Sequence, residues 1–354
     1  MSLEDLGIEH KKLEKTLFAS IPCNIKERKE LHAVLDTLTQ KIPREYITGP
    51  AFYIRQFVTS FKEGLDIEMG FPVSKPVQVD GIRTRTLPGM EVLSIVHKGP
   101  VEKRTETYGK LYGFISEHGL ISDEFSIEVF IDANKVDGNE FELYFILHNW
   151  NRLFSENLNR VLGEKARKEV MQGIEKLTFE STIAERFQWT RGAVERLDNL
   201  ADEDQKYDIL SSCAHVFPSA PIEKARTVYE TVKKQTGDSL KAVDAVIEHM
   251  DEDNAFVRPQ REGRIIYDTK NPAYPQDYEK ATTDIERRKA ACFCPTVRHH
   301  FDEGMSDTYC YCGSGWCRRQ WELITGKPVR IDVVQSVLKG DSVCQFAIHL
   351  PDDL

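Results

Sequence analysis

The sequence predicts an α+β protein: a duplicated strand-helix-strand-strand domain, then a helical middle region and a small α+β C-terminal region. Three observations predict this class. An order of strand, helix, strand, strand occurs twice near the start of the chain. Apolar residues then recur at helical spacing from Trp150 to about Asp253, and a cysteine-rich stretch with two strands follows. We expect three regions, 1–148, 149–276 and 277–354, the last packing with the helical region; 354 residues suffice for more than one hydrophobic core.

The first copy of the repeat shows clear alternation and one amphipathic helix. The expected strand, helix, strand and strand cover residues 13–25, 26–42, 51–58 and 65–73. In the helix, one face carries the apolar residues Leu31, Val34, Leu35 and Leu38. This spacing predicts a helix that packs on the strands.

The second copy repeats the order with different residues. Its expected elements are a strand over 81–99 bent at Pro88-Gly89, a helix over 101–119, and strands over 125–134 and 140–147. The helix places five residues near one stripe: Val101, Tyr108, Leu111, Tyr112 and Ile115. We therefore expect both tyrosines to face the strands.

Glu128 is the candidate functional residue of the second copy. Strand alternation puts Ile127 and Val129 on one face and Glu128 with Phe130 on the other. A carboxylate beside aromatic rings suits a cationic ligand, and partial desolvation would raise its pKa toward a general acid or base role. The alternative is a solvent-facing glutamate on an edge strand.

Several short motifs in this part of the chain resemble a known family. The LPG turn at 87–89, HKGP at 97–100, EHG at 117–119 and the E-V-F core at 128–130 are similar to the GyrI-like, AraC-type effector-binding domain, over roughly residues 10–147. The resemblance implies a cleft between the copies that holds small aromatic or cationic molecules, with Glu128 facing the ligand. The usual tyrosine two residues later is Phe130 here.

The expected ligand-binding set combines the resemblance with strand and helix spacing. Its members are Glu128, Phe130, Tyr53, Phe57, Tyr108 and Tyr112. The first functional hypothesis is a small-molecule-binding protein or sensor without a DNA-binding module, because no segment has a basic recognition helix. The alternative is a hydrolase of a small reactive or heterocyclic compound, with Glu128 as general acid or base. No GxSxG motif supports a serine nucleophile.

The rest of the chain divides into helices, an irregular stretch and a C-terminal α+β part. Helices are expected within residues 153–177, 189–200, 209–217, 221–235 and 238–250. Prolines indicate an irregular stretch over 257–276, and a hairpin of strands is expected over 328–350. Residues 180–351 are similar to an uncharacterised bacterial and archaeal family, distantly like 4-vinyl-reductase-type and aminothiazoline-carboxylate hydrolase-like domains.

Cysteines cluster near the C-terminus in two C-x-C pairs, Cys292 with Cys294 and Cys310 with Cys312. Four thiolates held together would suit zinc or an iron–sulfur cluster, with Cys317, His299 and His300 as spare ligands. The C-x-C spacing differs from the usual C-x₂-C knuckle, so reduced structural or ligand-facing thiols and a disulfide stay open as alternatives.

Charge and hydropathy exclude some classes of partner. The net charge of −10 disfavours nucleic acid as a general partner. No signal-peptide layout and no apolar run long enough for a membrane helix occur in the sequence, so we expect a cytoplasmic protein with a small-molecule partner and no membrane partner. The sequence does not indicate an oligomeric state.

Overall fold

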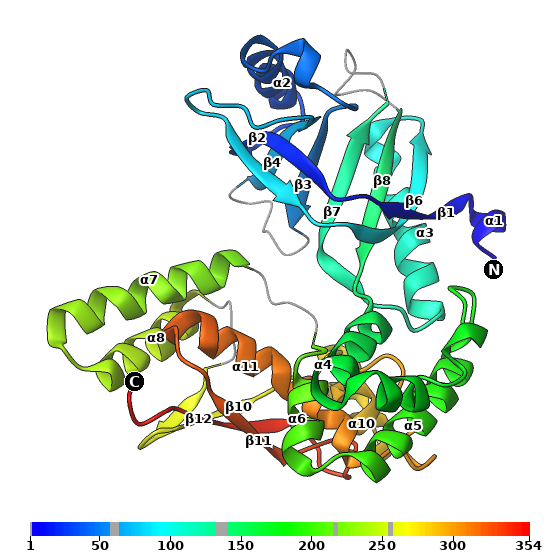
Figure 1. Ribbon diagram of the computed structural model, residues 1–354, viewed down its shortest axis with the longest axis vertical. Coiled ribbons are helices and arrows are strands. Elements are labelled where there is room, and N and C mark those ends of the chain that lie inside the picture. Colours follow the sequence, from blue (N-terminus) through cyan, green and yellow to red (C-terminus); the bar gives the residue numbers. More distant parts are fainter. Residues whose placement is uncertain (1, 57–63, 132–139, 215–218, 254–257) are drawn as a thin grey trace. The chain divides into compact units, whose positions relative to one another are not determined.

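The computed structural model describes residues 2–56, 64–131, 140–214, 219–253 and 258–354. The chain divides into two compact units, Met1–Asn149 and Trp150–Leu354 (Figure 1). Both units combine helices with antiparallel strands, so the α+β class is confirmed. Among the helices of the described ranges, none has the length and hydrophobicity needed to cross a membrane.

The first unit is built on an eight-stranded antiparallel sheet with the order β1-β6-β8-β7-β3-β4-β2-β5 (Figure 1). The strands are β1 (Ile8–Leu13), β2 (Thr16–Ile25), β3 (Phe52–Gln56), β4 (Leu65–Val73), β5 (Arg83–Leu87), β6 (Met90–Lys98), β7 (Ser122–Phe130) and β8 (Glu140–Leu147). Its helices are α1 (Leu3–Leu6), α2 (Glu30–Lys41) and α3 (Arg104–Glu117), with single 3₁₀ turns at Arg44–Tyr46 and Val101–Lys103.

The strand order shows the duplication directly. The first copy contains β2, α2, β3 and β4, and the second contains β6, α3, β7 and β8. The two halves of the sheet repeat one order from the centre outward: β3, β4 and β2 in the first copy, and β7, β8 and β6 in the second. The inner strands β3 and β7 pair with each other, with Tyr53 opposite Glu128. The two copies therefore meet at the centre of the sheet.

The two edge strands of this sheet differ from the sequence-based expectation. The strand expected over 13–25 is present as β2, but β1 before it was not expected. The strand expected over 81–99 is divided at the Pro88-Gly89 turn into β5 and β6, so the expectation of one strand there was wrong. The edge strands pair across the repeat: β1 pairs with β6, whereas β5 pairs with β2. Each copy thus receives its edge strand from the segment that precedes the other copy.

The two faces of this sheet have separate apolar clusters. On one face, Leu31 and Leu35 of α2 pack with Tyr53 and Phe130. On the other face lie Phe18, Phe52, Ile54, Leu87, Ile127 and Val129. Because Ile127 and Val129 alternate with Glu128 along β7, the helix-covered face is the face of Glu128.

The second unit contains a helical layer and a four-stranded antiparallel sheet with the order β11-β12-β10-β9. Its helices are α4 (Trp150–Val170), α5 (Ile183–Leu200), α6 (Glu203–Ser211), α7 (Ser219–Thr236), α8 (Ser239–Asp253), α9 (Pro275–Lys280), α10 (Asp284–Ala291) and α11 (Tyr311–Thr325). Its strands are β9 (Gln260–Glu262), β10 (Ile265–Thr269), β11 (Arg330–Gln335) and β12 (Gln345–His349). The stretch expected to be irregular thus supplies β9 and β10, whose main-chain groups pair within the sheet; that expectation was wrong.

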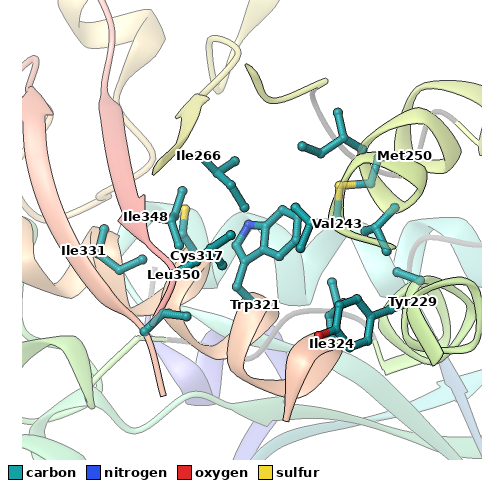
Figure 2. Close-up of a cluster of buried hydrophobic side chains, with 14 of the residues drawn as sticks. Tyr229, Val243, Met250, Ile266, Cys317, Trp321, Ile324, Ile331, Ile348 and Leu350 are labelled. Atoms are coloured by element: carbon teal, nitrogen blue, oxygen red, sulfur yellow. The ribbon is translucent and has the colours of Figure 1, made fainter. Parts of the chain in front are cut away.

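Trp321 of α11 lies at the centre of the largest apolar cluster in this unit (Figure 2). Its indole is fully buried between strand residues such as Ile266 and Ile348 and helix residues such as Val243 and Met250. Burial of an aromatic side chain of this size removes a large apolar area from water. The cluster therefore joins α7, α8 and α11 to the four-stranded sheet.

Candidate functional site

Glu128 is completely buried on the helix-covered face of the first unit. It lies near the C-terminal end of β7, opposite Tyr53 on β3 and Leu143 on β8. A central strand with neighbours on both sides excludes the alternative of an exposed glutamate on an edge strand. The carboxylate is therefore held inside the domain, where an unpaired charge would be strongly unfavourable.

Both carboxylate oxygens of Glu128 accept charge-assisted hydrogen bonds. The Arg28 Nη1 atom donates to Oε2 at 2.7 Å, and the Tyr108 hydroxyl donates to Oε1 at 2.7 Å. Arg28 Nη1 also lies 3.1 Å from the Tyr53 hydroxyl. Arg28 comes from the turn before α2 and Tyr108 from α3, so groups from both copies of the repeat hold one carboxylate.

Electrostatics keep this carboxylate ionised. Burial by itself would raise the pKa of Glu128, but the Arg28 guanidinium and the hydroxyls of Tyr53 and Tyr108 bring it below its ordinary value of 4.5. The expected rise in the pKa of Glu128 was therefore wrong, because the sequence-based argument did not include a buried cation. Burial and the Glu128 charge raise the pKa of Tyr53 and of Tyr108. Both hydroxyls stay protonated and act as donors.

Two arginines of the site have buried nitrogen atoms without a partner in the described part of the chain. Arg28 Nε and Nη2 and Arg55 Nε are buried and have no hydrogen-bond partner among the described residues. The Arg28 guanidinium carbon lies 5.0 Å from the centre of the Phe141 ring, and that of Arg55 lies 4.7 Å from the Tyr108 ring. The site thus contains guanidinium groups stacked on aromatic rings, with unused donors.

The structure brings together four of the six expected ligand-binding residues. Tyr53, Tyr108 and Glu128 are linked as described, and the Phe130 ring lies 5.8 Å from the Tyr53 ring. Tyr112 lies on the margin: its ring packs edge-on against Phe145, and 44% of the residue is exposed. Phe57, the sixth, falls outside the described residues.

Sequence reasoning missed both arginines. Strand alternation was sufficient to find Arg55, because it follows Tyr53 by two residues on β3 and therefore shares its face. Arg28 lies in a turn, where no periodic pattern predicts the direction of a side chain. Only the folded chain brings it to Glu128, 100 positions further along the sequence.

A separate apolar pocket of about 390 Å³ lies on the other face of the same sheet. Phe52, Val129 and Tyr144 belong to its lining, together with residues of the β1–β2 and β5–β6 turns. The Tyr144 hydroxyl donates to Glu142 at 2.9 Å. Its lining residues on β3 and β7 alternate with Tyr53 and Glu128, so this pocket and the Glu128 site are on opposite faces.

None of the eight cysteines, which all lie in the described ranges, forms a disulfide. Cys294 interacts electrostatically with Cys310 and with Cys312. Cys310 Sγ lies 3.0 Å from the Ser336 hydroxyl, and Cys312 Sγ accepts a hydrogen bond from Trp150 Nε1 at 3.3 Å. Cys317 donates to the buried Asp268 carboxylate at 3.4 Å. The Cys292 sulfur lies 4.0 Å from the Cys294 carbonyl oxygen.

The structure does not confirm the metal site that the sequence predicts for these positions. Within the described ranges, no three His, Cys, Asp or Glu side chains gather in a group able to hold a metal ion. Burial raises the pKa of Cys312 to about 12, and a hydrogen bond with Cys292 together with burial raises the pKa of Cys294. His300 instead lies 2.6 Å from Glu303 and stacks on Phe187. His299 does not join the thiols in such a group either, and burial lowers its pKa.

The first unit is thus a duplicated α+β domain with an ionised carboxylate held between its two copies. In the comparison with known families, residues 11–147 match the model of the GyrI-like small molecule binding domain. The sequence-based resemblance for this part of the chain is confirmed. The resemblance proposed for residues 180–351 stays a prediction.

Solved structures similar to part of the chain include a DNA-bound protein, a ligand-bound protein and a hydrolase. EcmrR in its DNA complex is 17% identical, with 40% of this chain and 56% of that chain covered and a TM-score of 0.35. SAV2435 bound to tetraphenylphosphonium is 10% identical, with 40% and 93% covered and a TM-score of 0.30. A hydrolase from Listeria innocua is 10% identical, with 40% and 90% covered and a TM-score of 0.30. The match therefore spans just over half of the EcmrR chain, and no curated protein matches this sequence.

Proposed function

We propose that the protein is a small-molecule sensor whose GyrI-like domain binds its ligand at the Glu128 centre, formed by Arg28, Tyr53, Arg55, Tyr108 and Glu128. The observation that carries the proposal is the fully buried carboxylate that groups from both copies hold. A buried ion pair is a costly feature that an apolar core of the same volume does not need. Its presence between the two copies is explained by a polar ligand that contacts them.

Aromatic rings around this centre support a ligand with a flat apolar part. Tyr53 and Phe130 lie on one side, and Tyr108 and Tyr112 each pack against Phe145 on the other. Rings in tilted or edge-on arrangements offer faces and edges to a further ring. A ligand inserted here would contact α3 and the turn before α2, so its binding would change the packing of both helices against the sheet.

Binding without turnover fits the state of Glu128 better than hydrolysis does. A general acid must be protonated at neutral pH, whereas Arg28 and the two hydroxyls lower the pKa of Glu128. As a general base, the carboxylate would first have to release Arg28 or Tyr108, because each of its oxygens already accepts a hydrogen bond. We therefore favour the sensor over the hydrolase acting through Glu128.

The test is a thermal-shift screen of the full chain against aromatic compounds of negative, neutral and positive charge. Compounds that stabilise the wild type should lose their effect in Tyr108→Phe and Glu128→Gln. The matched control is Tyr144→Phe, which removes a hydroxyl from the opposite face of the same sheet and should leave the shifts unchanged. Mass spectrometry of each stabilising compound after incubation should find it intact. The absence of stabilising compounds, or shifts lost in the control alone, would refute the site.

A further inference from the structure

We infer that the ligand of the Glu128 centre carries an oxyanion, a carboxylate or a phosphate, which binds the Nε–Nη2 edge of Arg28. This inference rests on the proposed function and adds the charge of the ligand to it. It runs against the sequence-based expectation of a cationic ligand, which considered Glu128 without Arg28 and Arg55.

The geometry of Arg28 leaves one edge of its guanidinium available. Nη1 donates to Glu128 and lies within hydrogen-bond distance of the Tyr53 hydroxyl. Nε and Nη2, which form the other edge, are buried and have no partner among the residues that the structure describes. The N–H groups along that edge form a planar fork that matches the two oxygens of a carboxylate or phosphate. A buried donor without a partner is unfavourable, so an acceptor is needed there.

Charge leads to the same conclusion. Among the described residues, Glu128 and Arg55 are charged groups with large electrostatic effects on Tyr53 and Tyr108, and Arg28 has one on Tyr53. Together these two positive charges and one negative charge sum to +1. Arg55 Nε adds another buried donor without a partner in the described part of the chain. An oxyanion would neutralise the site, whereas a cation would increase its positive charge.

The carboxylate of Glu128 is also poorly available to a cation. Its oxygens already accept hydrogen bonds from Arg28 and Tyr108, and the residue has no exposed surface. A cationic ligand would have to displace a guanidinium that is already paired at 2.7 Å. It would then leave Arg28 without a counter-charge in a buried position, which is strongly unfavourable.

The ring contacts give the preferred shape of the ligand. Arg28 lies over the Phe141 ring and Arg55 over the Tyr108 ring, so both guanidinium planes are supported from an apolar side. An aromatic body attached to the oxyanion would pack on the same rings while the oxyanion contacts the guanidinium edge. Aromatic acids are therefore the suitable probes.

The test compares three probes with one ring system, 2-naphthoate, 2-naphthylmethanol and 2-naphthylmethylammonium, by calorimetric titration of the full chain. We expect naphthoate to bind at least about tenfold more tightly than the alcohol, and the ammonium to bind more weakly than the alcohol. Arg28→Lys keeps the charge but loses the fork, and should weaken naphthoate about tenfold with little effect on the alcohol. Arg55→Gln should weaken naphthoate as well. Arg83→Gln, a change at an exposed arginine of the edge strand β5, is the control.

Each outcome decides the inference. Selectivity for naphthoate that depends on Arg28 and Arg55 supports it. If Arg28→Lys does not fold, the inference is tested by the order in which the wild type binds the three probes and by the loss of naphthoate affinity in Arg55→Gln. Tightest binding of the ammonium, lost in Glu128→Gln, overturns the inference and leaves the proposed function intact. If none of the three probes binds, the compounds found in the thermal-shift screen decide. Oxyanions that need both arginines support the inference, neutral or cationic ligands overturn it, and no ligand of any charge overturns the proposed function as well.

Discussion

Arg28→Gln removes the guanidinium that is paired with the buried Glu128 carboxylate. The two charges are 2.7 Å apart, with Glu128 fully buried and the Arg28 side chain 12% exposed. At the effective dielectric constant of protein sites, their gross attraction is about 6 kcal/mol. Loss of one partner from a buried pair typically lowers the free energy of unfolding by about 3–5 kcal/mol. The first unit has 149 residues, so we expect its melting temperature to fall by about 10–15 °C.

The placement of tryptophan allows each unit to be followed separately. All four tryptophans, Trp150, Trp189, Trp316 and Trp321, belong to the second unit. Tryptophan fluorescence therefore reports unfolding of that unit, while circular dichroism reports both. In urea, Arg28→Gln should move the dichroism transition of the first unit to lower denaturant concentration. The fluorescence transition should stay where it is in the wild type.

The pH dependence gives the decisive control. In the wild type, the pKa of Glu128 is lower in the folded state than its ordinary value of 4.5. Its ion pair therefore stabilises the fold fully above that value, and the stabilisation is lost as the pH falls through the folded pKa. In Arg28→Gln, burial without the paired guanidinium raises the pKa of Glu128, so the difference in stability between variant and wild type should shrink in acid. A variant as stable as the wild type at about pH 7, or a difference that grows in acid, would refute the reasoning.

Three further predictions concern single contacts. Tyr108→Phe removes a 2.7 Å hydrogen bond to an ionised carboxylate and should lower the free energy of unfolding of the first unit by about 1.5–3 kcal/mol in urea titrations; no change would mean that the hydroxyl is not a donor. Gly315→Ala should destabilise the second unit by several kcal/mol, because its Cβ would lie 1.9 Å from the main-chain oxygen of Ser211. Gly313→Ala in the same helix should be tolerated, because its Cβ would lie an ordinary 3.4 Å from the Phe346 ring. If the two variants unfold at the same denaturant concentration by fluorescence, the close approach of Gly315 to Ser211 is contradicted. With no reductant present, titration of the denatured protein should find all eight thiols reactive, whereas Cys312 should react slowly in the native state because its pKa is raised to about 12. Fewer than eight thiols would indicate a disulfide.

Periodicity predicted the duplicated order of the first unit and the burial of Tyr108 and Phe130. It did so because alternation and helical spacing are local properties of the chain. Periodicity could not predict that β1 pairs with the second copy and β5 with the first, because the pairing of an edge strand depends on which strand lies beside it after folding. The same limit applies to β9 and β10, whose partner β12 lies far along the sequence.

The charge of the candidate site could not be predicted for a related reason. Alternation placed Glu128 and Tyr53 on one face, but a turn residue, Arg28, determines whether the carboxylate is free or paired. That single contact changes both the direction of the pKa shift and the expected charge of the ligand. A pattern in one strand gives the position of a side chain, whereas the electrostatics depend on every element packed around it.

The most direct measurement is a crystal structure of the full chain with bound 2-naphthoate. The account predicts carboxylate density within hydrogen-bond distance of Arg28 Nε and Nη2, with the naphthalene ring against Tyr108 or Phe141 and the Glu128–Arg28 pair retained. Density for the probe in the apolar pocket beside Phe52 and Val129, with Arg28 Nε and Nη2 still without a hydrogen-bond partner, would contradict the account.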